Sequence, residues 1–273
     1  MKTSKHVLIT GATSGIGYEL AKLFAKDGYS LTIVARNSQE LHVTAHNLET
    51  LYGAKVQTIS KNLFKPNSAF EVYDELRNKG TQVDVLVNNA GHGLYGEFVD
   101  TDLNKELAII QLNISSLVTL TKLFLRDMVQ RGEGKILNTS SIASKAPGPW
   151  QSVYHGTKAF VQSFTEAVRE EVKDTGVTIT ALLPGATDTD FFRKAGMESS
   201  KITQDKSKLS DPADVARDGY EALMAGKDMI VSGLKNKMQV AMNGITPDAR
   251  LAEKMDKMRE PADTKKEAVS NKK

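Results

Sequence analysis

The stretch His6-Val-Leu-Ile-Thr-Gly-Ala-Thr-Ser-Gly-Ile-Gly17 decides the fold. The apolar run Val7-Leu-Ile9 is typical of a buried strand, and Ile16 to Lys26 has the pattern of the helix that follows. Between them, Gly11 permits a tight turn and Gly15 lets the backbone approach a pyrophosphate, while Gly17 allows close helix–strand packing. The free N–H groups of such a helix start favour phosphate. We therefore predict a nucleotide-binding loop, with an ordinary glycine turn as the alternative.

The end of the second predicted strand, Leu31 to Val34, bears on the choice of nucleotide. An acidic residue there binds the free 2′-hydroxyl of an adenosine ribose, whereas an arginine suits a 2′-phosphate. Here Ala35 takes the acidic position and Arg36 follows it. The sequence therefore predicts a preference for NADP(H) over NAD(H). The alternative is that Arg36 is a solvated loop arginine.

Short apolar runs alternate with longer helical patterns along most of the chain. Strands separated by helices of this length imply right-handed crossovers and a parallel sheet, so we expect an α/β fold. Further strands are expected at 56–59, 83–87, 135–138, 177–183 and 229–231, and further helices at 39–51, 66–78, 103–128, 152–174 and 212–224.

Bulk composition excludes several classes of protein. The 273 residues contain no cysteine, which rules out disulfides and thiolate chemistry. A net charge of +3 is too balanced to argue for nucleic acid or an anionic membrane surface. We find no long uncharged apolar run and therefore expect no membrane span. A strand pattern begins directly after the first five residues, which leaves no room for a secretory segment, so we expect a cytoplasmic protein.

Tyr154 and Lys158 stand four residues apart in the predicted helix from Ser152 to Asp174. Residues at this spacing share one helix face, so the ammonium is expected beside the phenol. A neighbouring positive charge lowers the pKa of a tyrosine from about 10 and makes it a usable general acid/base. Together with the nucleotide loop, the pair predicts proton and hydride chemistry in one pocket. Taken alone, a half-buried tyrosine and a solvated lysine are the alternatives.

Six motifs occur in an order and spacing known from one family. The motifs are Thr10-Gly-x-x-x-Gly-x-Gly17, Asn88-Asn-Ala-Gly91, Asn113, Ser141, Tyr154-x-x-x-Lys158 and Pro184-Gly-x-x-x-Thr189. With these motifs, over roughly residues 5 to 232, the chain resembles the short-chain dehydrogenase/reductase superfamily, in its short single-domain branch. The resemblance implies one doubly wound, Rossmann-like domain with a parallel sheet of about seven strands in the order 3-2-1-4-5-6-7 and helices on both faces.

The resemblance also implies the catalytic roles. Tyr154 would be the general acid in carbonyl reduction and the base in alcohol oxidation, and Lys158 would lower its pKa and hydrogen-bond the nicotinamide ribose. Ser141 would polarise the substrate carbonyl, with the adjacent Ser140 as its rival. Asn113 would hold a water against Lys158. The implied reaction is an NADP(H)-dependent interconversion of a ketone or aldehyde and an alcohol. The alternative is a non-catalytic NADP(H)-binding regulatory protein of the same fold.

The cofactor contacts that the resemblance implies come from several loops. Asn62 stands where many relatives carry an acidic residue near the adenine, and Thr189 would meet the nicotinamide carboxamide. The expected cofactor-binding residues, besides Tyr154 and Lys158, are Gly11, Thr13, Ser14, Gly15, Ile16, Gly17, Arg36, Asn37, Asn62, Leu63, Asn89, Ala90, Gly91, Pro184, Gly185, Thr187 and Thr189.

The sequence says little about the identity of the substrate. We expect pocket walls from Leu94 and Tyr95, from residues 143–150, and from a mobile lid after Pro184-Gly185. Its apolar side chains predict a hydrophobic ketone or aldehyde. The lid also carries the cations Arg193 and Lys194, which could bind a carboxylate or phosphate of the substrate. The commoner explanation for such residues is that they are solvated. The lid residues singled out are Phe191, Phe192, Met197, Arg193 and Lys194.

Histidines do not suggest a metal site. His42 and His46 share a predicted helix face but lack further ligands, so we expect no metal. His92 is expected either to line the pocket or to be a plain loop histidine.

The chain is expected to divide at residues 235 and 260. Residues 1–235 would form the nucleotide-binding and catalytic domain, and 236–260 a helical extension with an apolar stripe at Leu251, Ala252, Met255 and Met258. Residues 261–273 have the composition of a disordered tail. We expect a small carbonyl or alcohol substrate as partner. The resemblance further implies a homodimer or homotetramer, in which the helices at 103–128 and 152–174 pair across subunits.

Overall fold

The computed structural model, which describes residues 4–201 and 203–261, contains a seven-stranded sheet in the order β3-β2-β1-β4-β5-β6-β7. Every neighbouring pair of strands is parallel. The predicted class, strand order and single Rossmann-like domain are confirmed. The strands are β1 His6–Thr10, β2 Ser30–Ala35, β3 Val56–Ser60, β4 Val85–Asn88, β5 Gly134–Thr139, β6 Val177–Leu183 and β7 Met229–Val231.

The helices of the described residues follow the predicted pattern, with additions near the C-terminus. They are α1 Gly15–Lys26, α2 Ser38–Tyr52, α3 Ser68–Asn78, α4 Leu103–Ile110, the π-helix η1 Gln111–Ser116, α5 Leu117–Arg131, the 3₁₀ turn η2 Ile142–Lys145, α6 Ser152–Glu171, α7 Phe191–Lys194, the 3₁₀ turn η3 Lys206–Lys208, α8 Pro212–Met224, α9 Leu234–Asn243 and α10 Asp248–Arg259.

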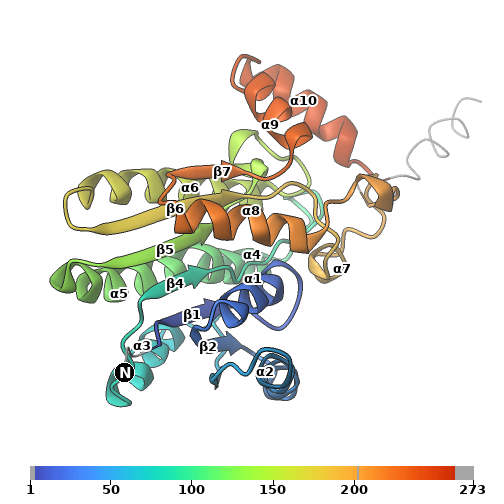
Figure 1. Ribbon diagram of the computed structural model, residues 1–273. Helices are drawn as coiled ribbons and strands as arrows, with labels where there is room; N and C mark the ends of the chain where they lie inside the picture. The colour runs from blue at the N-terminus through green and yellow to red at the C-terminus, as the bar shows by residue number, and fades with distance from the viewer. Residues whose placement is uncertain (1–3, 202, 262–273) are drawn as a thin grey trace, which may run out of the picture.

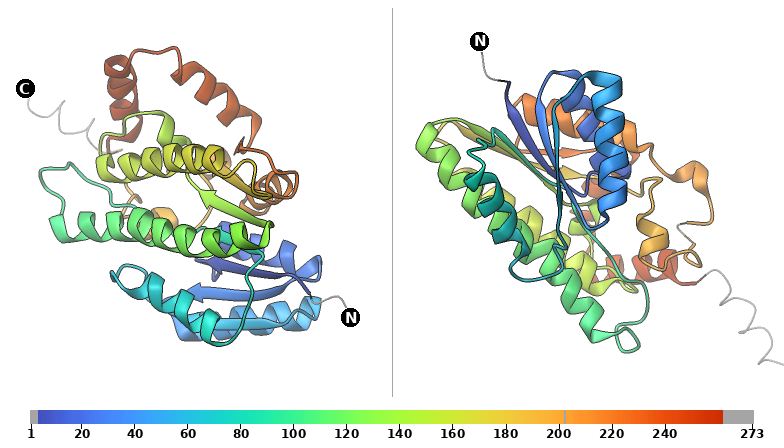
Figure 2. Two further views of the ribbon diagram at one scale, coloured as in Figure 1. Left: turned by 90° about the vertical axis from the view of Figure 1, so that its left-hand side faces the viewer. Right: turned by 90° about the horizontal axis from the view of Figure 1, so that it is seen from below.

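Helices cover both faces of the sheet. One face carries α1 with α2 and α8 beside it, and the other carries α3, the α4–η1–α5 run and α6 (Figure 1). Figure 2, left, shows the helices of the second face side by side in one layer. The carboxyl ends of the strands therefore meet at one edge, and the loops that follow them gather there.

The apolar runs of the strands explain this arrangement. Successive residues of a strand point to opposite faces. Val7 and Ile9 pack in the core under α1 and α8, while Leu8 between them packs in the core under α3 and α5. Val87 and Leu86 of β4 divide in the same way. Because both faces are covered, continuous apolar strands are stable, as expected of a parallel sheet.

The predicted helix 103–128 is interrupted in the structure. Between α4 and α5 the chain widens into the π-helix η1, and Asn113 lies within it. The Asn113 side chain donates from Nδ2 to the His92 carbonyl (2.9 Å), and its Oδ1 accepts from the His92 N–H (3.0 Å). Wide turns of this kind aim a side chain that a regular helix would place elsewhere, and they occur often at functional sites.

The same run corrects the expectation about membranes. Leu103–Arg131 is, by length and composition, apolar enough to cross a membrane, so the statement that the chain has no such run is wrong. In the structure 44% of its most apolar window is buried, and it packs on α3, α6, β4 and β5. Core helices meet the same two criteria, so this run by itself is weak evidence for a membrane span.

The segment after β7 forms two helices beyond the β7 edge of the sheet (Figure 1). α9 begins just before the expected helical extension of 236–260 and lies largely within it, although the sequence predicted no bounds for this helix; its Val240 packs against the cluster that contains Leu183 and Val231. The expected stripe lies on α10, where Leu251 and Met255 are buried and Ala252 is half-buried, but Met258 is exposed, so that part of the prediction is wrong. The domain boundaries at 235 and 260 stay predictions. The expected disordered tail lies, but for Pro261, outside the described residues.

Asn88 joins β4 to its neighbours. Its Nδ2 donates to Asn138 Oδ1 on β5 (2.9 Å) and to Thr121 Oγ1 on α5 (3.0 Å). Asn138 in turn donates to Thr165 Oγ1 on α6 (3.0 Å). All four side chains are buried. This polar network connects the strands that carry the site to the helices behind them.

Replacing Asn88 tests the network. Asn88→Ala leaves the buried Asn138 Oδ1 without its donor, so we expect the free energy of unfolding to fall by about 2 kcal/mol. Urea unfolding of this variant beside Asn78→Ala, an exposed asparagine at the end of α3, measures the effect. Equal stability of the two variants would show that the network contributes little.

Candidate active site

A cavity of about 1630 Å³ runs along the carboxyl ends of the strands. Crevices at this edge of a doubly wound sheet are the usual ligand sites. Most of the residues predicted from the sequence line it. They are Gly11, Thr13, Ser14, Gly15, Ile16, Arg36, Asn37, Leu63, Asn89, Ala90, Gly91, Ser141, Tyr154, Lys158, Pro184, Gly185, Thr187 and Thr189.

Three predicted residues lie outside the cavity wall. Gly17 is behind the loop, where an added Cβ would overlap the Gly11 carbonyl and Asn89 Nδ2. Asn62 lines a separate small hollow, and its Oδ1 accepts from the Phe64 N–H (3.2 Å). Asn113 lies behind Gly91 and His92. These three support the wall and do not form its surface.

The glycine loop has the geometry of a phosphate cradle. Gly11 and Gly15 have φ of 68° and 55°, which favour glycine, and a Cβ on Gly15 would lie 2.8 Å from Thr189 Cγ2. Asn89 Nδ2 holds the loop by donating to the Thr10 and Gly11 carbonyls, both at 3.1 Å. Ser14 precedes α1 without a capping bond from its side chain. The start of α1 therefore fits the diphosphate of a dinucleotide.

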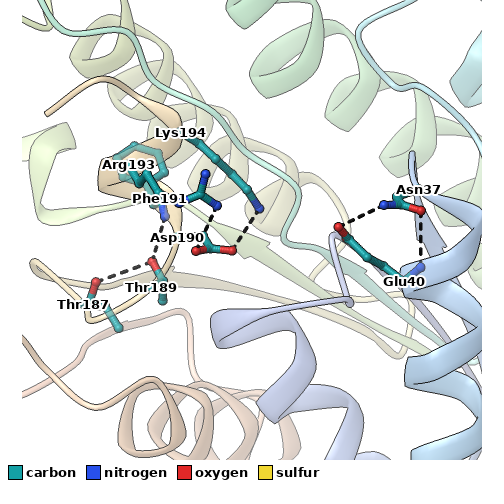
Figure 3. Close-up of polar contacts among 8 residues, drawn as sticks. All are labelled: Asn37, Glu40, Thr187, Thr189, Asp190, Phe191, Arg193 and Lys194. Atoms are coloured by element: carbon teal, nitrogen blue, oxygen red, sulfur yellow. Dashed lines mark hydrogen bonds and ion pairs between the residues drawn. The ribbon is translucent and has the colours of Figure 1, made fainter. Parts of the chain in front are cut away.

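Arg36 and Phe64 both line the cavity, and Arg36 lies over the Phe64 ring, with Cζ 4.9 Å from its centroid. Such a contact orients a guanidinium without using its hydrogen-bond donors. Asn37 caps α2 and donates to Glu40 Oε1 (3.1 Å), as Figure 3 shows. The side chain of Asn37 is therefore engaged within the protein. The sequence did not single out Phe64.

The expected lid begins with a network of hydroxyl and backbone contacts. Thr189 Oγ1 donates to the Thr187 carbonyl (3.5 Å) and accepts from the Phe191 N–H (3.3 Å) (Figure 3). Asp190 pairs with Arg193 (3.2 Å) and Lys194 (3.5 Å). Both ion pairs are exposed, and of the two cations only Lys194 lines the cavity. Mobility of the segment stays a prediction.

The expected walls are only partly observed. Phe191, Phe192 and Met197 line the cavity, as do Ala143 and Ala146. His92 lines it as well, and burial, followed by the charge on Arg36, lowers its pKa. Leu94, Tyr95 and Trp150 lie outside the wall. Side chains from α9 and α10, which the sequence did not suggest, take their place; among them are Asn236, Gln239, Met255, Met258 and Arg259.

No group of three or more His, Asp or Glu side chains that could hold a metal occurs within 4–201 and 203–261. His42 and His46 are both exposed on α2.

Tyr154 and Lys158 lie on the same side of α6. Lys158 Nζ is 5.8 Å from the Tyr154 ring centroid and donates to the Thr139 carbonyl at the end of β5 (2.8 Å). The Ser141 hydroxyl acts on the pKa of the Tyr154 phenol and donates to the Pro184 carbonyl (3.3 Å), whereas Ser140 donates to the Lys158 carbonyl (2.8 Å). Of the two rival serines, Ser141 is therefore the one beside the phenol. Tyr154, Lys158 and Ser141 form one cluster on the cavity wall.

Burial dominates the electrostatics of this cluster. It raises the pKa of Tyr154, and the hydrogen bond with Ser141 and the charge of Arg259 oppose that rise. The expected lowering of the Tyr154 pKa by Lys158 is wrong here, because the desolvation of the phenol is the larger effect and Nζ is held on the Thr139 carbonyl. Burial also lowers the pKa of Lys158 to about 8. Burial therefore disfavours the charged form of both groups, and with a pKa of about 8 Lys158 still carries its proton at neutral pH.

The sequence missed two buried residues of the site. Gln151, just before α6, and Arg259, at the end of α10, both line the cavity, and Arg259 Nη1 donates to Gln151 Oε1 (2.6 Å). A signal existed, because Arg259 continues the four-residue spacing of Leu251 and Met255. A cation at a position where a helix buries apolar residues points to a polar partner inside.

Lys158 is expected to lower stability at neutral pH. The difference between a pKa of 10.5 and one of about 8 corresponds to roughly 3 kcal/mol. The folded protein binds the lysine proton less tightly than the unfolded chain does. The penalty is therefore full below pH 8, shrinks between pH 8 and 10.5 and vanishes above that range.

We predict that Lys158→Met raises the melting temperature at pH 7 and that its advantage over the wild type disappears toward pH 10.5. Thermal unfolding across this range measures the difference. Lys122→Met, at an exposed position on α5, is the control and should show no such trend. A Lys158→Met variant that is less stable at pH 7 would contradict the account.

Comparisons with known proteins agree with this geometry. The family model described as short chain dehydrogenase matches residues 5–199. A very-long-chain 3-oxoacyl-CoA reductase of Laccaria bicolor is 37% identical over 182 residues, which cover 65% of this chain and 53% of that protein. The chain thus spans about half the length of that relative.

Two further proteins extend the likeness. Sulfoacetaldehyde reductase 2 of Chromohalobacter salexigens is 37% identical over 187 residues, which cover 68% of this chain and 73% of that protein. A solved structure of a short-chain dehydrogenase from Sphingobium yanoikuyae in complex with NADPH matches with a TM-score of 0.79 at 28% identity, over 89% of this chain and 96% of that one. The chain therefore belongs to the short-chain dehydrogenase family of oxidoreductases.

Proposed function

We propose that this protein is an NADP(H)-dependent oxidoreductase that interconverts a ketone or aldehyde and the corresponding alcohol. The observation that carries the proposal is the cluster of Tyr154, Ser141 and Lys158 on the wall of a cavity that also contains the phosphate cradle. A proton donor, an oxygen-stabilising hydroxyl and a dinucleotide site within one crevice match carbonyl reduction.

The residues around the crevice suit NADP(H). The start of α1, with Gly11 and Gly15, would hold the diphosphate, and Arg36 would meet the 2′-phosphate. The Sphingobium yanoikuyae structure, which contains NADPH, supports this choice. When bound, NADPH supplies the hydride that reduces the carbonyl carbon.

Tyr154 would supply the proton. The phenol is protonated at neutral pH and so has a proton to give to the carbonyl oxygen, and the interactions with Ser141 and Arg259 oppose the rise in its pKa that burial causes. Ser141 would stabilise the charge that develops on that oxygen. In alcohol oxidation Tyr154 would act as the base and would first have to lose that proton.

Lys158 and Asn113 would support the proton transfer. Lys158 Nζ lies beside the phenol ring, and a Cβ on Gly91 would be 3.3 Å from Nζ and 3.6 Å from Asn113 Oδ1. The space next to Gly91 thus connects the two polar groups. A positive Lys158 also stabilises the phenolate that remains after the proton has left.

The relatives support a carbonyl substrate. The Laccaria bicolor protein is named for a 3-oxoacyl thioester and the Chromohalobacter salexigens protein for an aldehyde. Phe191, Phe192 and Met197 supply an apolar wall for such a molecule. The alternative, a regulator without turnover, has no observation in its favour, because the Tyr154 cluster is complete.

Tyr154→Phe tests the proton donor. Since positioned general acids contribute about 10²- to 10⁴-fold, we expect kcat for NADPH-dependent reduction to fall by at least 100-fold. Tyr52→Phe, on α2 and outside the cavity, is the matched control. NADPH should still raise the melting temperature of Tyr154→Phe. Retained turnover in that variant would reject the assignment.

Arg36→Ala tests the cofactor preference. Loss of a charged hydrogen bond to the 2′-phosphate should lower the ratio of NADPH to NADH affinity by about 30-fold. Titration calorimetry with both cofactors measures the ratio, and Arg77→Ala, an exposed arginine on α3, should leave it unchanged. Tighter binding of NADH than of NADPH by the wild type would overturn the Arg36 interpretation.

A further inference from the structure

Arg259 occupies an unusual place for a charged side chain. It is the last residue of α10, only 8% exposed, and it lines the cavity that contains Tyr154. Leu251, Met255 and Arg259 stand four residues apart and make up the buried face of that helix. A guanidinium thus stands where the preceding turns bury apolar side chains.

The guanidinium has few partners inside the protein. A guanidinium carries five N–H donors, and in the described part of the chain only Nη1 donates a hydrogen bond, to Gln151 Oε1 at 2.6 Å. The buried Nε has no partner, and neither has the buried Nε2 of Gln151. No carboxylate within 4–201 and 203–261 forms an ion pair with Arg259. The neighbouring Asp256 accepts a hydrogen bond from Trp150 Nε1 (2.9 Å).

The fold nevertheless anchors Arg259 in this position. Its carbonyl accepts hydrogen bonds from the Tyr95 hydroxyl and from Ser200 Oγ (3.4 Å), which belong to two different loops. Trp150, which bonds Asp256, stacks on Tyr95 with ring centroids 5.7 Å apart and adopts φ of 66°, a costly conformation for a residue with a side chain. These contacts hold the end of α10 against the cavity.

An unpaired buried cation is costly, and burial lowers the pKa of Arg259 to about 10. An anion in the cavity would remove most of this cost. The planar guanidinium presents two parallel N–H groups that match the two oxygens of a carboxylate or a similar oxyanion. The unpartnered Nε2 of Gln151, next to it, offers a further donor.

The location of Arg259 distinguishes a substrate anion from a cofactor phosphate. The phosphate cradle is at the start of α1, whereas Arg259 is joined to Gln151, directly before the helix that carries Tyr154. Arg259 acts electrostatically on the Tyr154 phenol, and Met255 from its own helix also lines the cavity. An anion bound here would therefore lie near the carbonyl that Tyr154 protonates.

We propose that Arg259, with Gln151, binds an oxyanion of the substrate, so that the protein acts on ketones or aldehydes that carry a carboxylate, sulfonate or phosphate close to the carbonyl. The inference rests on the proposed carbonyl reduction and narrows its substrate class. Hydrophobic ketones without charge, which the apolar wall alone suggests, would then be the poorer substrates.

The test compares acids with their neutral esters. Initial rates of NADPH oxidation are measured for 3-oxobutanoate against methyl 3-oxobutanoate, and for 4-oxobutanoate against its methyl ester. For the wild type we expect kcat/KM to be at least about 10-fold higher for one acid than for its ester. In Arg259→Met this acid-to-ester ratio should fall by about 100-fold, mostly through KM, and Arg259→Lys should fall between the two.

Arg250→Met, an exposed arginine on the same helix, is the matched control and should keep the wild-type ratio. A wild type that reduces the esters faster than both acids overturns the inference without any variant and leaves carbonyl reduction standing. An unchanged ratio in Arg259→Met, with both rates reduced together, also overturns it, because Arg259 would then act on Tyr154 or on the fold. If the wild type reduces none of the four compounds although NADPH binds, the proposed function itself fails.

Discussion

The site depends on the hydrogen bond that the buried ammonium of Lys158 donates to the sheet. Lys158 is 5% exposed, and it donates to the Thr139 carbonyl, where β5 ends and the loop to Ser141 begins. This contact helps to join α6 to the sheet on the wall where Tyr154 and Ser141 lie. A cation without a carboxylate is costly at this depth, so a lysine here lowers stability in return for a charge next to the phenol. Such a trade between stability and function is common at catalytic sites.

Two buried cations of the described residues line the cavity, and they come from different parts of the chain. Lys158 comes from α6 within the matched family region, and Arg259 comes from α10, beyond it. The helices after β7 therefore do more than extend the domain: they supply part of the wall around Tyr154. In the proposed function, the shared fold would provide the hydride and proton chemistry, and this extension would select the molecule that receives them.

The sequence predicted the fold and the core of the site well. The alternation of apolar runs with helical patterns reflects a sheet buried on both faces, and the glycine spacing reflects contacts that leave no room for a Cβ at Gly15 or Gly17. These are local constraints, and local sequence expresses them. The same holds for the four-residue spacing of Tyr154 and Lys158.

The sequence was a poorer guide where distant segments meet. The π-helix contains Asn113, whose side chain hydrogen-bonds the backbone of His92, and no helical periodicity records such a contact. The pairing of Arg259 with Gln151 joins residues 108 positions apart. The rise in the Tyr154 pKa depends on how deeply the packed chain buries the phenol, so the spacing to Lys158 alone led to the opposite sign.

A crystal structure of the protein with NADPH tests the central claim most directly. The account predicts that the nicotinamide end lies against Tyr154 and Lys158, with Ser141 facing the same space, and that the 2′-phosphate lies beside Arg36. A complex with the cofactor reversed, or with the Tyr154 hydroxyl turned away from the nicotinamide, would contradict it.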